Sequence, residues 1–458
     1  MSTAQTSLPP GPKGLPFIGS MLDFQRRPLQ FYRDLERTYG GMVTIRIGKQ
    51  PVLLCFRPEH IRYFLVENPR NFIKPGTATG AGLKLFLGDG LLTIDGEQHR
   101  QQRRLVQPAF HKHRVDSYAT TMTRYAQETV DSWRPGTVVN MASEMQYLTL
   151  RIITKTLFDV DSIEQTRQLG RAFDAVISSG PQRSAVMGRL LPSFSARQER
   201  EREEGARVID TFVYGLIEQR RKMNEDTGDV LSMLLAAQKS EPGSMSDRQI
   251  HDHVLTFVAA GHETAQNTLA WTMYLLSQHP HVRARLLAEL QTVLNGRVPA
   301  LEDLPQLPYL EAVINEAWRF YPPAWRQARM AIEDFELGGY HFPAGTITIL
   351  SQWVVHNLPD IWGDPENFRP ERWDRQSGQQ IPQGAYFPFG LGPRICIGMP
   401  FAQLETKLLL ATILQRYVPQ LAPGARVVFQ PLVTLRPRYG MPMRLDTNDT
   451  LTPALQAI

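Results

Sequence analysis

The chain has 458 residues, of which 42% are hydrophobic and 21% charged, and its formal net charge is +5. This composition is typical of a folded globular protein, and the two cysteines exclude a disulfide framework and favour a reducing cytoplasm. The N-terminus lacks the basic and apolar segments of a signal peptide, and no apolar stretch approaches the roughly 20 residues that span a bilayer, so we expect a cytoplasmic protein without a membrane anchor.

The first hundred residues predict a lead-in, a hairpin and a loop. Residues 9–19 are rich in proline and glycine and indicate a stiff, non-helical segment, so we expect a lead-in over 1–20. Residues 41–56 predict two short strands around the turn Gly48-Lys49-Gln50-Pro51. Residues 75–95 are rich in turn-forming residues and predict a mobile loop.

Helical patterns dominate from about residue 96 to 320. Short strands and irregular, proline-containing segments follow from 321 to 395, and 421–446 again predict short strands. The pattern therefore predicts a single domain over 21–458 that is mainly α, with small β-sheets drawn from both ends of the chain.

One predicted helix is unusually long. Ser246 and Gln249 form a capping-box pattern at its start, and helical periodicity continues for roughly 30 residues until Pro280. Its middle, residues 256–261, is apolar or small on every side, which predicts burial.

Polar residues interrupt this helix just after its small-residue stretch. Thr264 can donate a hydrogen bond to the Ala260 carbonyl and, with Gly261, bend the helix so that a ligand has room. Alternatively, Thr264 is a satisfied core threonine beside a solvated Glu263.

A second informative segment runs from Phe389 to Gly398, Phe-Gly-Leu-Gly-Pro-Arg-Ile-Cys-Ile-Gly. Its glycines permit conformations and close approaches that a Cβ would block. A helical stretch over 401–414 places Cys396 near a helix N-terminus, which favours the thiolate form.

Three uses of this thiolate are open from the residues alone: a nucleophile, a zinc ligand or a haem-iron ligand. Zinc would need further ligands nearby, and Cys55 is distant in sequence. A nucleophile would need a histidine partner, which can be remote. Cys396 as a buried small hydrophobe is a fourth reading, although a core cysteine would not need Arg394 and the glycines.

The Cys396 segment resembles the haem-binding signature of the cytochromes P-450. Three further segments resemble motifs of that family in the same order: Ala260–Thr264, Glu316–Arg319 and Phe368–Trp373. The resemblance extends from the proline-rich lead-in to the C-terminal strands. It implies a single cytochrome P-450 fold with haem b between the long central helix and the cysteine-ligand helix.

The resemblance also implies a role for individual residues. Cys396 would be the axial thiolate of the haem iron, which favours O–O cleavage. The haem contacts implied are Cys396, Arg394, Arg103, His99, Arg329, Phe389, Gly390, Gly398, Ala260 and Gly261. His99 stands where many members have tryptophan, and its imidazole can still donate a hydrogen bond to a propionate.

Two polar groups receive different roles from the resemblance. Glu263 and Thr264 are implied to deliver protons to iron-bound dioxygen, which favours a monooxygenase over a peroxide-driven enzyme. Glu316, Arg319 and Arg372 are implied to form a structural, buried ion network that supports the cysteine segment.

The chain ends soon after the haem domain, so we expect electrons from a separate ferredoxin or flavodoxin with its NAD(P)H-dependent reductase. Arg100, Arg104, Lys112 and Arg114 are candidates for docking this acidic partner, or else they form a solvated basic face. No dense basic block or stacking motif supports nucleic-acid binding, and we expect a monomer.

The substrate is expected to be a hydrophobic small molecule of the fatty acid, terpene, steroid or polyketide class. The candidate pocket residues are Leu85, Phe86, Leu87, Phe257, Ala260, Ala265, Ala324 and Trp325. Arg326 could anchor a carboxylate, but we expect it to point away or to pair with a neighbouring residue. The Ala260–Thr264 segment and the lead-in resemble those of bacterial fatty-acid hydroxylases.

The predicted function is insertion of one oxygen atom from dioxygen into this substrate. One alternative is a haem-thiolate enzyme that rearranges or couples its substrate without inserting oxygen. A haem-binding sensor without turnover is a second alternative, against which the Glu263–Thr264 pair argues.

Overall fold

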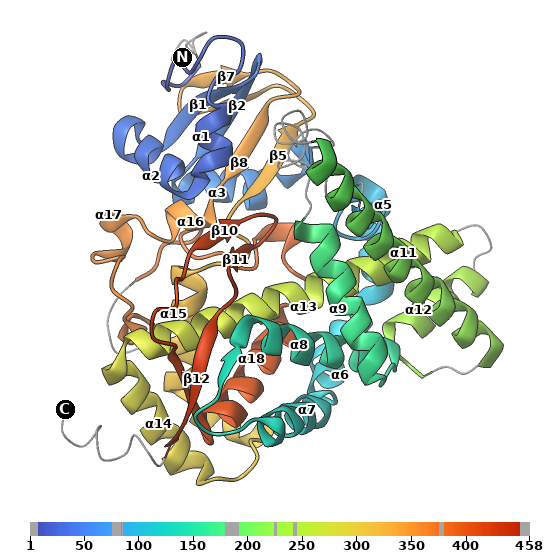
Figure 1. Cartoon of the computed structure of the whole chain (residues 1–458). Coiled ribbons are helices and arrows are strands. Elements are labelled where there is room, and N and C mark those ends of the chain that lie inside the picture. The colour runs from blue at the N-terminus through green and yellow to red at the C-terminus, as the bar shows by residue number, and fades with distance from the viewer. Residues whose placement is uncertain are drawn as a thin grey trace. The chain divides into compact units, whose positions relative to one another are not determined.

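The computed structural model describes residues 8–75, 84, 86–178, 192–223, 227–240, 245–374 and 380–448 (Figure 1). These residues form two compact units. The first unit contains the described residues of Met1–Ala81, Asn315–Cys396 and Gln430–Arg436. The second contains those of Gly82–Ile314, Ile397–Phe429 and Pro437–Ile458.

A five-stranded sheet organises the first unit. Its order is β1-β2-β8-β5-β3, with strands β1 (Met42–Ile47), β2 (Gln50–Cys55), β3 (Phe72–Ile73), β5 (Gln327–Ala331) and β8 (Ile347–Leu350). Only the β2–β8 pair is parallel, and Figure 1 shows these blue N-terminal and orange C-terminal strands side by side. The predicted hairpin is thereby confirmed, although β2 begins within the residues assigned to the turn.

The remaining strands and short helices are as follows. The hairpin β6 (Phe335–Leu337) with β7 (Tyr340–Phe342) and the pair β10 (Phe429–Pro431) with β11 (Leu435–Pro437) are separate small sheets. The helices are α1 (Met21–Arg26), α2 (Pro28–Tyr39), α3 (Pro58–Arg62), α16 (Gln352–Val355) and α17 (Pro359–Trp362). A short π-helix is η1 (Tyr63–Glu67), and the 3₁₀ turns are η2 (Pro69–Asn71), η5 (Pro370–Trp373) and η7 (Gly392–Arg394).

The second unit is mainly helical, as the sequence predicted. Its helices are α5 (Gly96–Val106), α6 (Lys112–Asp116), α7 (Ala119–Ser132), α8 (Met141–Phe158), α9 (Ile163–Ser178), α11 (Pro192–Met223), α12 (Val230–Ser240), α13 (Asp247–Gln278), α14 (Pro280–Leu294) and α18 (Met399–Leu414). The 3₁₀ turns are η3 (Gln107–Phe110) and η4 (Leu301–Gln306), and the sheet β4-β12-β9 pairs Val138–Asn140, Pro442–Thr447 and Tyr417–Leu421. Helix α15 (Pro308–Phe320) begins in this unit and ends in the first.

Helix α13 is the long helix that the sequence predicted. The Ser246 hydroxyl accepts a hydrogen bond from the Gln249 N–H at 3.2 Å, and the Gln249 side chain accepts one from the Ser246 N–H at 2.8 Å. This capping box satisfies two N–H groups that a helix start leaves without partners. The helix packs against α8, α11 and α18 and is buried along most of its length.

The described chain contains no helix that is long and apolar enough to cross a membrane. Large apolar side chains are buried in the core of each unit. Trp271 in the second unit and Trp362 in the first are both almost fully buried. Burying side chains of this kind contributes about 1.5–3 kcal/mol each. Packing, more than helix propensity, therefore stabilises these elements.

Candidate functional site

A tightly hydrogen-bonded loop in the first unit presents Cys396. The Gly390 N–H donates to the Phe387 carbonyl at 2.9 Å, and the Cys396 N–H donates to the Phe389 carbonyl at 2.9 Å. Gly390 and Gly392 have φ angles of +74° and +67°, which side chains with a Cβ rarely adopt. The loop leaves the Cys396 thiol exposed and fixes its backbone at the same time.

The glycines of this loop differ in what they contribute. A Cβ at Gly392 would lie 1.8 Å from the Leu65 carbonyl oxygen, so the loop backbone lies directly against η1. Gly398 is the N-cap of α18 with φ of −83°, an angle open to any residue. We predicted conformational freedom at all three glycines, and the backbone requires it only at Gly390 and Gly392.

Phe389 packs against Trp318 of α15, with ring centroids 4.9 Å apart and planes at 77°. This edge-to-face arrangement is a favourable geometry for aromatic pairs. It joins the cysteine loop to the helix that carries Glu316 and Arg319.

The carboxylate of Glu316 is the centre of a buried hydrogen-bond network in the first unit. Arg319 donates from Nε to Oε2 at 2.9 Å and from Nη2 to Oε1 at 2.8 Å. Arg372 donates from Nε to Oε1 at 3.3 Å. Trp373 Nε1 and the Arg369 N–H, both at 3.0 Å, complete the set around the two oxygens.

This arrangement matches the structural network that the resemblance implied. The side chains of Glu316, Arg319 and Arg372 are at most 2% exposed. The two arginines also donate to backbone carbonyls, among them those of His356 and Trp362, and Arg372 pairs with the Asp364 carboxylate as well. A buried ion pair is tolerable when its remaining donors and acceptors are satisfied in this way.

His356 is a residue of this region that our sequence analysis missed. Its Nε2 accepts a hydrogen bond from the Phe387 N–H at 3.0 Å, and its carbonyl accepts one from Arg319 Nη1 at 2.8 Å. Burial, followed by the charge of Arg319, lowers the pKa of His356 to about 3. His356 is therefore neutral and links the Glu316 network to the cysteine loop.

The candidate cations of the first unit are Arg394 and Arg329. Arg394, in η7, is partly exposed. Arg329, in β5, is 5% exposed and donates to the Ala328 carbonyl at 2.9 Å and to Gln327 Oε1 at 3.0 Å. Both side chains thus keep a guanidinium group in or near the interior of this unit.

In the second unit, α13 carries the predicted oxygen-activating residues. The Thr264 hydroxyl donates to the Ala260 carbonyl at 2.9 Å, as the sequence predicted. Ala260 is exposed and Thr264 is partly exposed, whereas Glu263 is buried. A Cβ at Gly261 would lie 2.6 Å from Cδ1 of Ile153 in α8, so glycine allows these helices to pack closely.

His99 and Arg103 occupy α5, where His99 is buried and Arg103 partly exposed. Between them, Gln102 Oε1 lies 2.7 Å from Nε2 of the buried His253 in α13. Burial lowers the pKa of His253 to about 4, so the imidazole is neutral. This contact fixes the position of α5 on α13.

Glu405 in α18 is a second residue that we did not predict. Its side chain is 1% exposed, and neither carboxylate oxygen has a hydrogen-bond partner within the described part of the chain. Burial raises the pKa of Glu405 well above its usual value, because the interior disfavours the charged form of the carboxyl group.

The candidate substrate residues of the second unit are apolar. Leu85 lies outside the described residues, and Leu87 is buried. Phe86 packs edge-on against Phe173 with centroids 6.0 Å apart. Phe257 is buried against Phe110, and Ala265 is buried in α13.

In the first unit Ala324 is partly exposed, whereas Trp325 is buried and donates from Nε1 to the Leu432 carbonyl at 3.0 Å. Arg326 donates to the Tyr32 hydroxyl at 3.1 Å and lies over the Trp325 ring. Arg326 thus pairs with its neighbours, as we expected.

A polar cluster holds the segment that follows Leu87. The Asp89 N–H donates to Asp252 Oδ2 at 2.8 Å, and a Cβ at Gly90 would lie 2.0 Å from Oγ1 of Thr256. The His251 ring contacts two carboxylates. Its Nδ1 lies 3.0 Å from Asp252 Oδ1, and its Nε2 lies 2.9 Å from Oδ1 of Asp210 in α11. No local pattern indicated this cluster, because Asp89 and Asp210 are 163 and 41 positions from their partners in α13.

The basic residues proposed for partner docking have unequal surroundings. Arg100 pairs with Glu97, and Lys112 pairs with Asp116 at 2.6 Å, while Arg104 is exposed. Arg114 instead donates to the Gly228 carbonyl at 2.7 Å, so its guanidinium is engaged within the unit. Arg100, Arg104 and Lys112 therefore stay candidates for partner docking, and Arg114 does not.

The donor chemistry fits haem better than a metal held by side chains alone. The described residues contain no group of three or more His, Cys, Asp or Glu that could hold a metal ion. Cys55 is fully buried and burial raises its pKa well above the usual value, so Cys396 is the accessible one of the two cysteines. Haem iron needs only one such protein ligand.

Comparisons with known proteins agree with this fit. The family model of cytochrome P450 matches residues 9–438. The chain is 36% identical to a cyclooctat-9-en-7-ol 5-monooxygenase of Streptomyces melanosporofaciens over 93% of this chain and 94% of that protein. It is 35% identical to the pentalenene oxygenase of Streptomyces avermitilis, over 91% and 92% of the two chains.

A solved structure of similar fold is that of retinoic-acid-bound cyanobacterial CYP120A1. The TM-score is 0.84 at 27% identity, covering 97% of this chain and 100% of that one. Cytochromes P450 bind haem through a cysteine thiolate and use redox partners and hydrophobic substrates. The matched length, the relatives and the fold together show that this chain belongs to the cytochrome P450 family, as a haem-dependent monooxygenase.

Proposed function

We propose that Cys396 is the thiolate ligand of the haem iron. The observation that carries this assignment is the loop in which the Cys396 N–H is bonded to the Phe389 carbonyl while the thiol stays exposed. When bound, haem supplies activation of dioxygen, and a thiolate ligand favours O–O cleavage. Backbone N–H groups near the sulfur tune the electron donation of such a ligand.

The haem propionates require cations or hydrogen-bond donors. We propose Arg394 and Arg329 from the first unit, and Arg103 and His99 from the second. The partial or complete burial of all four side chains supports this assignment, because a cation in a low-dielectric setting interacts more strongly with a carboxylate. The contacts of Phe389, Gly390, Gly398, Ala260 and Gly261 with haem stay predictions of the same assignment.

Thr264 and Glu263 are proposed to deliver protons to the reacting oxygen. The Thr264 hydroxyl can accept a hydrogen bond from water while it donates to the Ala260 carbonyl, and it can hold that water in place. Glu263, one residue earlier and buried, is the proposed proton carrier. An enzyme that rearranges or couples its substrate is the second candidate, and dependence of an oxygenated product on NAD(P)H and dioxygen separates the two.

The proposed substrate class is cyclic terpenes. Two relatives, 36% and 35% identical to this chain over the aligned residues, are named for cyclooctat-9-en-7-ol and pentalenene oxidation. The described candidate residues Phe86, Phe257 and Ala265 offer only apolar surface, which suits a hydrocarbon. Arg326, engaged with Tyr32, does not supply a carboxylate anchor, which disfavours fatty acids.

For electron supply we propose a separate ferredoxin or flavodoxin, docked through Arg100, Arg104 and Lys112. The exposed Arg104 should dominate, since Glu97 and Asp116 offset the charge of the other two. The reduction rate should fall as salt rises and fall further in Arg104→Glu. A rate that is insensitive to salt would exclude this docking mode. We also propose a monomeric protein in the cytoplasm; the two cysteines suit a reducing compartment.

The deciding experiment is the absorption spectrum of the reduced, CO-bound protein. The wild type and Cys55→Ser should show the red-shifted Soret band of thiolate ligation, and Cys396→Ser should lose it. Cys55 is the matched control because it is a buried cysteine in the same unit. Retention of the band in Cys396→Ser would reject the assignment.

A further inference from the structure

The lead-in forms a tight turn that exposes apolar side chains. Leu15 and Gly19 form an antiparallel bridge, and Gly19 bridges in turn to Ile47 of β1. The Ser20 N–H donates to the Arg46 carbonyl at 2.7 Å, and the Gly48 N–H donates to the Ile18 carbonyl at 3.2 Å. The turn is therefore held firmly to the β1–β2 hairpin.

The tip of this turn is directed away from the protein. Phe17 is 91% exposed, Leu15 54% and Ile18 36%. Phe17 has φ of +64°, a left-handed conformation that an aromatic residue rarely adopts. A Cβ at Gly19 would lie 2.1 Å from the Arg46 carbonyl oxygen, so the close backbone approach that fixes the turn depends on glycine.

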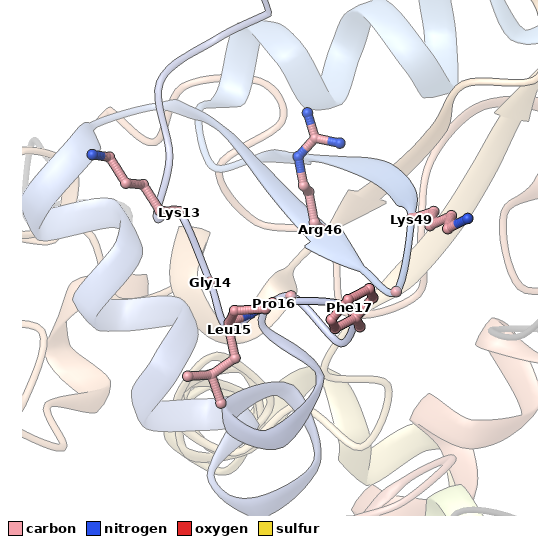
Figure 2. Close-up of a pocket in the computed structure, with 9 residues that line it drawn as sticks. Lys13, Gly14, Leu15, Pro16, Phe17, Arg46 and Lys49 are labelled. Atoms are coloured by element: carbon pink, nitrogen blue, oxygen red, sulfur yellow. The ribbon is translucent and has the colours of Figure 1, made fainter.

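Cations surround the exposed tip. A surface groove of about 570 Å³ is lined by residues of the turn together with Lys13, Arg46 and Lys49, and no carboxylate is among its lining residues. Figure 2 shows Lys49 beside Phe17 and Lys13 on the other side of Leu15. Residues 8–27 and 42–50 hold five cations and one carboxylate, Asp23, so they carry a net +4 of the chain's +5.

From these observations we propose that this surface, Lys13–Ile18 with Arg46 and Lys49, binds peripherally to an anionic lipid bilayer. Phe17, Leu15 and Ile18 enter the interface between headgroups and acyl chains, and the cations contact the lipid phosphates. The long alkyl stems of Lys13 and Lys49 can cover apolar surface while their ammonium groups stay in water. A projecting apolar tip with a lysine on either side fits a deformable headgroup layer better than a flat protein interface.

Binding of this surface to a membrane does not depend on the haem chemistry and would give the enzyme a location. A peripheral enzyme would take a hydrophobic substrate that is itself dissolved in the membrane. Binding would be reversible, because a few apolar side chains and charges give only modest affinity.

Co-sedimentation of the purified full chain with lipid vesicles tests the proposal. The wild type should bind vesicles of phosphatidylcholine with phosphatidylglycerol, bind those of phosphatidylcholine alone much more weakly, and dissociate at high salt. Phe17→Ser should weaken partitioning about tenfold or more, as expected for loss of a buried aromatic side chain. Lys49→Glu should weaken it about fivefold or more, the effect of one cation at an anionic surface.

Matched control variants distinguish binding through this surface from non-specific binding to vesicles. Val298→Ser removes an exposed apolar side chain elsewhere, and Lys239→Glu reverses an exposed charge elsewhere. Both should bind vesicles as the wild type does, and all four variants should keep the CO-bound spectrum. The proposal fails if the wild type ignores anionic vesicles, if Phe17→Ser binds unchanged, or if the surface instead retains an acidic protein partner that Lys49→Glu releases.

Discussion

The Phe387 N–H donates a hydrogen bond to Nε2 of His356 at 3.0 Å, which ties the cysteine loop to a neutral, buried imidazole. In the same loop, the Gly390 N–H donates a hydrogen bond to the Phe387 carbonyl. Phe387 is thus held on both its N–H and its carbonyl. Loss of the imidazole would leave one of these groups without a partner in the interior.

The His356→Phe variant should therefore be destabilised by about 1–3 kcal/mol, the cost of a buried donor without an acceptor. The loosened loop should also convert part of the reduced, CO-bound protein to a form without thiolate ligation. His356→Gln, which keeps an acceptor of similar reach, should recover much of the wild-type spectrum. Equal spectra for the wild type and His356→Phe would show that this bond does not position the loop.

Acid should destabilise the protein through His356 and His253. Their pKa values fall to about 3 and about 4 in the folded state, below the usual value near 6.5. Between the folded-state pKa of each histidine and about 6.5, the unfolded state binds more protons than the folded state. The free energy of unfolding therefore falls as the pH drops from about 6.5 toward about 3. Denaturant unfolding of His253→Gln should show a shallower loss over this window than the wild type, and an unchanged slope would contradict the assignment.

Glu405 should have the opposite pH dependence. Its pKa in the folded state lies well above the ordinary value, so the folded state binds the extra proton. Stability should then fall as the pH rises above about 4.5, the usual range for a glutamate. Glu405→Gln keeps the shape without the ionisation, and its melting temperature should exceed that of the wild type at alkaline pH but not at pH near 5. A parallel decline of both proteins would refute the prediction.

Removal of one partner from the Glu316 network should be severe. Arg372→Ala leaves the Glu316 carboxylate buried with fewer donors, for which a loss of about 3–5 kcal/mol is expected. Haem content after purification should drop with it. The exposed pair of Arg197 and Glu201 provides the control, since Arg197→Ala should change the free energy of unfolding by less than about 1 kcal/mol.

Thr264 and Thr268 permit a matched test of proton delivery. Each hydroxyl donates to the carbonyl four residues earlier at 2.9 Å, so alanine removes the same local bond from either position. Thr264→Ala should lower product formed per NAD(P)H by about tenfold or more, within the range of general acid–base effects. Thr268→Ala should leave this ratio near that of the wild type. Equal losses would indicate a role in helix structure only.

The parts of the molecule that the sequence predicted well depend on local signals. The capping box at Ser246 and the apolar periodicity behind it define α13, and the glycines before Cys396 define a loop. The Glu316 network was predictable only through the family resemblance, because Arg372 lies far from Glu316 in sequence. A single domain over 21–458 stays a prediction.

Other features depend on tertiary packing, which leaves little trace in local sequence. His356 and Phe387 are 31 positions apart, and nothing near His356 indicates that its ring accepts a backbone N–H. Glu405 occupies a helix whose other residues are mostly apolar, and only its complete burial shows that its pKa is raised. Gly398 shows the converse, because a glycine in a conspicuous motif has an ordinary backbone conformation.

The bond from Thr264 to the Ala260 carbonyl constrains what this hydroxyl can do next. A hydroxyl carries one proton, and while that proton is shared with a carbonyl the group offers only lone pairs to other molecules. To donate toward another oxygen, the Thr264 hydroxyl must turn its proton away from the Ala260 carbonyl, by rotation about the Cβ–Oγ1 bond or about χ1. A single side-chain rotation therefore sets whether this position acts as an acceptor or as a donor, and α13 can make that change without moving its backbone.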